Sequence, residues 1–321
     1  MGLELLKDFT VEKLHPIIGA KTIQLVVFRE ILDFAVFRTE DDRELNTVVT
    51  PRSVKDTEEV QRVAFLGTKQ KAVESRTMER ILRTAGEQAL KEGPDSSKLK
   101  NWLEKQAECY LKDNLCLNCP RCILFGATST ESGRGRVPNI KHRIEYSTAY
   151  SLLPYEEIET SITFNAINDA SQSTEQALGT RYAVRPATLF PSIITLKSVT
   201  IEELVLTIKT LLAAKSYGAE TRIGGDVRNT IIGIAAGWEE IITSLELTLE
   251  LSADNELVPE QVSRILESYK SHTGNPQKVK VFSPEEVEAI VTEAANKDVD
   301  LDLLKSLYSQ VDEYRNSQLK G

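Results

Sequence analysis

The sequence lacks the features that identify membrane proteins, secreted proteins and proteins that are basic overall. No apolar run approaches the ~18 residues that a membrane-spanning helix needs. The opening segment MGLELLKDFT has no basic leader followed by an apolar stretch. Lys and Arg number 39 against 48 Asp and Glu, and the net charge is −9. We therefore expect a cytoplasmic protein that has no membrane partner and keeps its thiols reduced.

The motifs of common enzymes are also missing. There is no G-x-S-x-G, no glycine-rich loop that ends in Gly-Lys-Ser/Thr, and no recognisable catalytic partner for any of the three histidines. Carboxylates cluster in the charged turn 40–44, but such a turn is typical of a solvated surface. The sequence predicts a protein that is not an enzyme, and a metal-dependent nuclease is the alternative.

Cysteine is scarce, yet all four cysteines lie in the short segment CYLKDNLCLNCPRC. Their spacing is C-x6-C-x2-C-x2-C, and thiolates two residues apart can bind one metal ion from a tight turn, which Pro120 favours. An iron–sulfur cluster, a site with three cysteines and a metal-free cluster are the alternatives. We predict a closed, structural zinc site with four ligands, Cys109, Cys116, Cys119 and Cys122.

Hydrophobic patterning predicts both strands and helices. Strands are expected at 21–37, 46–50, 157–168, 181–196 and 244–252, the last because its leucines alternate with polar residues. Helices are expected at 73–91, 98–112, 198–218 and 258–269, from 283, and after 300. The helix at 198–218 has the clearest ends, with Thr200 and Glu203 as a capping box and Gly218 at the C-terminal end.

The order of these elements predicts an α+β fold. Strand, helix, insertion, strand, strand, helix and strand form a ferredoxin-like or RRM-like βαββαβ core with a large insertion after its first helix. A helical C-terminal tail follows this core.

Basic residues are concentrated locally although the chain is acidic. The strip RGRVPNIKHR (134–143) has no acidic residue, and the loop YGAETRIGGDVRN (217–229) combines glycines with arginines. Glycines let backbone amides approach phosphates, and arginines can bind phosphates through two hydrogen bonds. A solvated surface or a tight turn is the alternative interpretation. The candidate phosphate contacts are Arg52, Lys55, Lys69, Lys71, Arg134, Arg136, Lys141, Arg143, Arg181, Arg185, Arg222, Arg228 and Asn229.

Three segments resemble a known family when they are taken together and in order. They are CPRCILFGATSTESGRGRV, RYAVRPATLFPSIITLKSVTIEEL and GAETRIGGDVRNTIIGI. They are similar to the backbone subunits of CRISPR effector complexes, which belong to the RAMP superfamily. The sequence looks most like the repeated backbone subunit of the type I-D Cascade, and the resemblance covers most of residues 20–250.

This resemblance implies a division of the chain. An RRM-like palm would comprise 15–50 and 141–252, a finger insertion with the zinc site 51–140, a thumb segment 165–185, and a helical region 253–321. It also implies that several copies line up along one CRISPR RNA and support pairing between guide and target in antiviral defence, with the candidate phosphate contacts binding RNA. Further implied partners are target nucleic acid and the large and guide-handle-binding Cascade subunits.

Two alternatives of other classes stay open. Related type III subunits cut target RNA with a loop aspartate, so one alternative is a metal-dependent nuclease that cuts bound target at regular spacing. The other is an unrelated α+β protein that is stabilised by zinc and binds its partners through the acidic tail.

Overall fold

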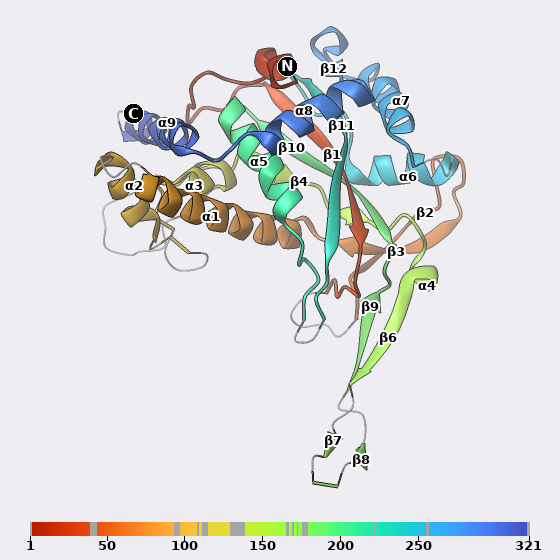
Figure 1. The fold of residues 1–321 in the computed structure, drawn as a ribbon. Helices are drawn as coiled ribbons and strands as arrows, with labels where there is room; N and C mark the ends of the chain where they lie inside the picture. Colours follow the sequence, from red (N-terminus) through yellow and green to blue (C-terminus); the bar gives the residue numbers. More distant parts are fainter. Residues whose placement is uncertain are drawn as a thin grey trace.

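The computed structural model describes residues 2–38, 44–92, 97–107, 109–110, 115–128, 139–164, 167–168, 170–171, 173–174, 179–220, 223–254 and 257–319. Its centre is an antiparallel five-stranded sheet in the order β12-β11-β1-β10-β4 (Figure 1). In chain order these strands are β1 (Thr22–Ile31), β4 (Ile144–Tyr146), β10 (Leu189–Lys197), β11 (Val227–Gly237) and β12 (Lys280–Val281).

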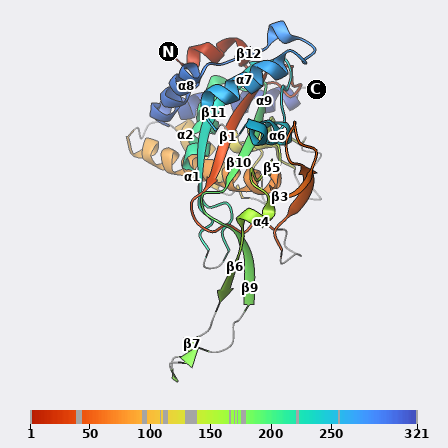
Figure 2. The ribbon, with the colours of Figure 1, turned by 90° about the vertical axis from the view of Figure 1, so that its right-hand side faces the viewer.

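Helices lie on both faces of this sheet and extend beyond one end of it (Figures 1 and 2). They are α1 (Gly67–Glu92), α2 (Ser97–Ala107), α3 (Pro120–Phe125), α4 (Tyr155–Ile158), α5 (Ile201–Ala213), α6 (Ser244–Asp254), α7 (Pro259–Lys270), α8 (Pro284–Asn296) and α9 (Leu301–Leu319), with 3-10 turns at Leu3–Phe9 and Pro276–Lys278. No helix in the described ranges is long and apolar enough to cross a membrane.

The central strand β1 is buried on both faces. Its side chains alternate between two apolar clusters, because successive residues of a strand point to opposite sides of the sheet. Ile23, Leu25 and Val27 belong to the cluster that includes the inner faces of α1 and α5. Val26 and Phe28 belong to the cluster formed with α6 and α7 on the other side. This double burial explains the nearly continuous apolar run in TIQLVVFREI.

The connectivity confirms the expected α+β fold with an RRM-like core. The order β1, α1, β4, β10, α5, β11 is a βαββαβ unit, and within the sheet its four strands lie in the order fourth, first, third, second. The helices α1 and α5 pack against each other on one face of the sheet. The capping box of Thr200 with Glu203 at the start of α5 is confirmed, and so is the helical C-terminal region.

The strand predicted at 244–252 is wrong, because this segment forms the helix α6. Leu247 and Leu251 are buried and lie one helical turn apart, so the alternating leucines also satisfy a helical period. Thr243 and Glu246 form a capping box at its start, with the Glu246 carboxylate accepting from the Thr243 amide at 2.8 Å. The fourth strand of the core is β11, which lies earlier in the chain.

The prediction that Gly218 ends the helix at 198–218 is also wrong. The helix α5 ends at Ala213, and its C-cap is Ala214. A Cβ atom on Gly218 would lie 2.7 Å from the Cβ of Ala35, so the residue permits close contact between two loops instead.

Smaller sheets flank the core. One contains β2 (Thr47–Pro51), β3 (Glu59–Phe65) and β5 (Ala149–Tyr150). A hairpin of β6 (Glu159–Phe164) and β9 (Gly179–Val184) projects away from the body (Figures 1 and 2), and it leads to the short pair β7 (Ile167–Asn168) and β8 (Ser173–Thr174). The strand expected at 181–196 is therefore divided between this hairpin and the central sheet.

A buried polar network joins the elements of the core. Arg29 of β1 has no exposed surface, and its Nη2 lies 2.8 Å from Oε1 of Glu74 on α1, while its Nη1 donates to Oδ1 of Asn229 at 2.8 Å. Glu74 also accepts hydrogen bonds from the hydroxyls of Tyr217 (2.8 Å) and Tyr146 (2.6 Å). Burial lowers the pKa of Arg29, but Glu74 and the tyrosines outweigh it, so the pKa is raised and the guanidinium stays charged.

Replacement of Glu74 should destabilise the fold strongly. Glu74→Ala leaves the Arg29 charge buried without its carboxylate, so we expect the free energy of unfolding to fall by about 3–5 kcal/mol. Urea titration followed by circular dichroism measures this change. The double variant Arg29→Met/Glu74→Leu removes both charges and should lie closer to the native stability. An unchanged urea midpoint for Glu74→Ala would show that the pair does not stabilise the core.

Candidate metal centre and nucleic-acid interface

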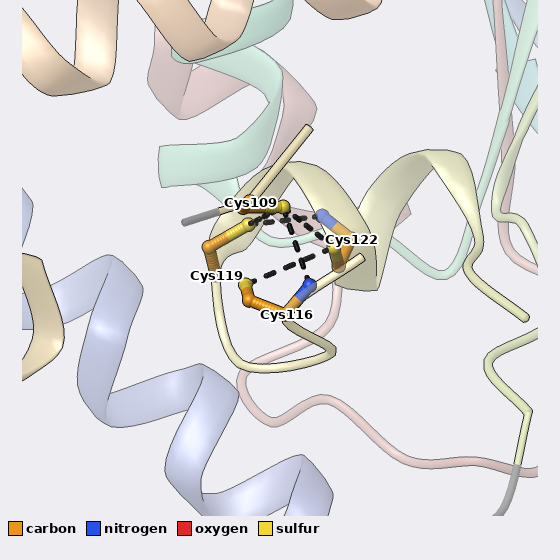
Figure 3. Close-up of side chains that lie close together, drawn as sticks. All are labelled: Cys109, Cys116, Cys119 and Cys122. Carbon is orange, nitrogen blue, oxygen red and sulfur yellow. Dashed lines mark hydrogen bonds between the residues drawn. The ribbon is translucent and has the colours of Figure 1, made fainter. Parts of the chain in front are cut away.

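The four cysteines converge from two short stretches of chain, one with Cys109 and one with the other three (Figure 3). Cys109 follows α2, Cys116 and Cys119 lie in the turn before α3, and Cys122 lies in the first turn of α3. The Cys119 sulfur caps α3 by accepting a hydrogen bond from the Cys122 amide at 3.5 Å. Leu117 has φ 58°, in the left-handed region, which lets the chain reverse tightly between two of the cysteines.

The sulfur positions fit one tetrahedral metal ion. The Sγ atoms of Cys109 and Cys122 are 3.6 Å apart, while Cys109 to Cys119 and Cys116 to Cys122 are each 4.0 Å. A tetrahedral ion with metal–sulfur bonds of about 2.3 Å places its sulfur ligands about 3.8 Å apart. A disulfide needs about 2.05 Å, and all four cysteines are free. The cluster could therefore hold a metal ion with no coordination position left open.

Arginines surround this cluster. Arg121 is buried, donates two hydrogen bonds to the Ser75 hydroxyl (3.0 and 2.9 Å), and brings Nη1 to 3.9 Å from the Cys122 sulfur. Hydrogen bonds from the other three thiols lower the pKa of Cys122, and Arg121 lowers it further. Arg83 of α1 donates to the carbonyl oxygen of Cys109. Two guanidinium groups thus lie beside the cysteines and would offset the negative charge of metal-bound thiolates. Sequence reasoning missed both arginines, although Arg121 stands inside the cysteine motif itself.

Two of the candidate phosphate contacts are buried and serve the fold. Arg143 is 1% exposed, and it binds both carboxylate oxygens of Glu203 and donates to the carbonyl oxygens of Ser198 and Ile123. Asn229 is 8% exposed, and its amide bonds the Arg29 network. Neither side chain can reach a phosphate in this conformation, so the sequence-based assignment of both residues is corrected.

Other candidates lie in ion pairs at the surface, where solvent keeps the pairs weak. The pairs are Arg52 with Asp56 and Glu58, Lys55 with Asp254, Arg181 with Glu220, and Arg228 with Glu30.

A group of basic side chains gathers near β4, and we call it the lysine patch: Lys71, Lys141, His142 and Lys197. Burial lowers the pKa of His142, and the three lysines lower it further while Glu145 opposes them. Lys197 bonds Glu145 at 2.8 Å and Glu240 at 2.7 Å. Within the described ranges the side chains of Lys71, which is half-buried, and Lys141, which is exposed, form no ion pair or hydrogen bond, so neither ammonium group is committed to a carboxylate.

The remaining candidates are placed as follows. Lys69 is half-buried and donates to the Val36 carbonyl oxygen at 2.8 Å. Arg185 is exposed at the base of the hairpin, where its amide donates to the Ile158 carbonyl oxygen at 2.9 Å. Arg134, Arg136 and Arg222 lie outside the described residues, as does most of the acidic turn 40–44.

An RRM-like sheet with a cysteine-bearing insertion and a projecting hairpin is the architecture that the resemblance to RAMP backbone subunits predicted. The particular family follows from the sequence. The profile of the Csc2 CRISPR family matches residues 9–316, and the chain therefore belongs to the Csc2 family.

A solved structure shares this fold, and a second is reported beside it. The crystal structure of Csc2 from Thermofilum pendens is 21% identical, with coverage of 98% of this chain and 94% of that chain and a TM-score of 0.68. A chain of a CRISPR RNA-guided surveillance complex in a pre-nicking state is 9% identical, with coverage of 85% and 100% and a TM-score of 0.49. No curated protein sequence matches the chain significantly.

Loss of one cysteine should abolish metal binding. Cys119→Ser and Cys122→Ser each remove a buried ligand, so we expect the metal content to fall from about one equivalent per chain to near zero. Plasma mass spectrometry of the purified variants measures the metal content. The midpoint temperature of thermal unfolding should fall as well. Tyr110→Ser alters an exposed residue beside Cys109 and should leave both values unchanged. Full metal occupancy in either cysteine variant would contradict the assignment.

Proposed function

We propose that the protein is a CRISPR RNA-binding backbone subunit of a type I-D Cascade, in which copies of the chain line up along the guide and support its pairing with target. The observation that carries this proposal is the Csc2 family match over residues 9–316. The RRM-like connectivity supports it, since this topology is common among proteins that bind single-stranded RNA. Helices cover both faces of this sheet, so the proposed RNA contacts lie outside those faces. Base pairing would then read the target sequence, and the protein would bind backbone and shape.

The proposed parts follow the expected division with one change. The palm comprises 15–50 and 141–252, together with α1, because α1 packs against α5 and β4. The rest of 51–140 forms the finger, which carries the cysteine site. The projecting hairpin around 165–185 acts as the thumb, and 253–321 forms the helical C-terminal region. The large subunit and the guide-handle-binding subunit are the further proposed partners, in the cytoplasm.

Zinc is the ion that we propose for the cysteines. Four thiolates in a closed tetrahedral set match structural zinc, which neither changes oxidation state nor needs a coordination position for substrate. Its contribution would be to hold the turn before α3 in place. An iron–sulfur cluster would give visible absorbance, so the spectrum of the purified protein separates the two.

We propose that the subunit is not an enzyme. Among the residues described, the cysteine cluster is the only group of three or more His, Cys, Asp or Glu whose ligand atoms lie close enough to share a metal ion. A closed thiolate site leaves no position for an attacking water. Cleavage of bound target in Mg²⁺ or Mn²⁺ would favour the nuclease alternative instead.

The proposed RNA contacts fall into two groups. Lys71, Lys141 and Arg185 are the first, because within the described ranges they have no ion-pair partner. The second group must exchange a weak surface carboxylate for a phosphate, and it consists of Arg52, Lys55, Arg181 and Arg228. Lys69, Arg134, Arg136 and Arg222 complete the proposed set. Arg143 and Asn229 are not part of it.

The lysine patch should contribute to RNA affinity through charge. Lys71→Ala/Lys141→Ala removes two phosphate contacts, so binding to CRISPR RNA should weaken and the slope of log K against log salt should fall by about 0.7 per contact. Fluorescence anisotropy at several salt concentrations measures both. Lys297→Ala/Lys305→Ala removes two exposed lysines from the C-terminal helical region and should change neither. Equal slopes for the two double variants would exclude the patch from the interface.

The decisive experiment for the function is expression with the neighbouring genes. The purified complex should contain RNA of uniform length that derives from CRISPR repeats, seen first in the ratio of absorbance at two wavelengths and then by sequencing. A folded, metal-loaded protein that carries no RNA would overturn the proposal that the subunit binds CRISPR RNA.

A further inference from the structure

Two arginines converge on one carboxylate beside the projecting hairpin. The Glu220 carboxylate accepts a hydrogen bond from Nε of Arg181 on β9 at 3.2 Å, and the same oxygen, Oε1, accepts from Nη2 of Arg38. The three side chains come from separate segments of the chain and are 21–33% exposed. Water therefore screens this group less than it screens the other surface pairs, such as Arg228 with Glu30.

The backbone holds Glu220 in place independently of its carboxylate. The Glu220 amide donates to the Ile223 carbonyl oxygen at 3.0 Å, and the Ile223 amide donates to the Glu220 carbonyl oxygen at 2.6 Å. The Ile223 side chain packs with Val36 and with Ala183 of β9 in a small apolar cluster. The carboxylate can therefore leave the arginines by rotation of its own side chain while the backbone around it stays docked on the hairpin.

The Glu220 carboxylate fits the two arginines poorly. Oε1 accepts from both guanidinium groups, while Oε2 is buried and has no hydrogen-bond partner within the described part of the chain. A buried acceptor without a partner is costly. A phosphodiester carries the same single negative charge and presents two free oxygens, so each guanidinium would receive an oxygen of its own. A phosphate therefore satisfies this arrangement better than the carboxylate does.

A third basic side chain lies near the same carboxylate. Lys69 of α1 donates to the Val36 carbonyl oxygen at 2.8 Å. Burial lowers the pKa of Lys69, and the charge of Arg38 lowers it further, while Glu220 opposes both. Three basic side chains thus gather around Glu220, and such a group attracts anions.

We propose that Arg38 and Arg181 form a phosphate site which Glu220 occupies in the free protein, and that a backbone phosphate of bound RNA replaces the Glu220 carboxylate there. The proposal rests on the proposed function, because it assigns the site to CRISPR RNA. Glu220 is then an internal competitor. RNA engages the site only in molecules whose carboxylate has left the arginines, so the apparent affinity is reduced by the fraction of molecules in which the site is open.

The first test removes the competitor. Glu220→Gln keeps the size of the side chain but not its charge, so the dissociation constant for CRISPR RNA should fall about 5-fold. Fluorescence anisotropy measures this constant. Glu267→Gln is the matched control, since Glu267 pairs with Lys270 at 3.4 Å on α7 and its loss changes the net charge by the same amount. This control should leave the dissociation constant unchanged.

A second substitution shows where the gain arises. Arg38→Gln in the Glu220→Gln background should cancel the tighter binding, because one of the two phosphate ligands is lost. A gain that survives Arg38→Gln would overturn the proposal. A Glu220→Gln variant that binds RNA no more tightly than Glu267→Gln would overturn it as well.

A titration without RNA separates this proposal from the proposed function. Pyrophosphate should bind to Glu220→Gln more tightly than to the wild-type protein, and isothermal titration calorimetry measures both affinities. A wild-type protein that binds no RNA would contradict the proposed function and the assignment of the site to RNA. Equal pyrophosphate affinities in the two proteins would contradict the role of Glu220 as a competitor, whether or not RNA binds.

Discussion

The fold depends on the pairing of charges inside a sheet that helices cover from both sides. Because β1 is buried on both faces, Arg29 cannot reach water and must find a carboxylate on a neighbouring element. Glu74 provides it and so fixes the start of α1 over the centre of the sheet. The next residues of α1, Ser75 and Glu79, hold Arg121 beside the cysteines. One buried pair therefore positions α1, and α1 positions the metal centre.

The burial of arginine explains why sequence reasoning misplaced part of the RNA surface. In RGRVPNIKHR the residue Arg143 looks like the end of a solvated basic strip, but its partner Glu203 lies 60 residues further along the chain. An ion pair between residues so far apart in the chain produces no local sequence pattern from which it could be predicted. Local constraints, in contrast, could be predicted: the capping boxes that begin α5 and α8, the cysteine spacing, and the order of strands and helices. Of the candidate RNA contacts, Arg143 and Asn229 are withdrawn, and the others stay as proposals.

The sequence analysis did not identify the fourth core strand, β11, because the glycines that allow its close packing weaken the strand pattern. The strand β11 reads VRNTIIGIAAG, and glycine and asparagine weaken the pattern by which strands are recognised. A Cβ atom on Gly233 would lie 2.8 Å from Cγ1 of Val262, and one on Gly237 would lie 2.8 Å from Cγ2 of Val279. These glycines therefore let α7 and the following loop approach the sheet. The spacing of the leucines in 244–252 is compatible with a strand and with a helix. In the structure the segment is a helix, which buries Leu247 and Leu251 against β1.

The acidic C-terminal region belongs to the body of the protein. The Asp312 carboxylate accepts from the Trp102 indole in the insertion, and the Gln310 side chain bonds Thr200 and Glu202 at the start of α5. One helix thus contacts the core on one side and the cysteine-bearing insertion on the other. Because α2 and α3 have little sheet to pack on, their position relative to the core depends on α1, on α9 and on the cluster of cysteines, which could hold a metal ion. If copies line up along one RNA as proposed, an error in that position would repeat at every copy, so a metal ion at this site would have a function without any catalytic chemistry.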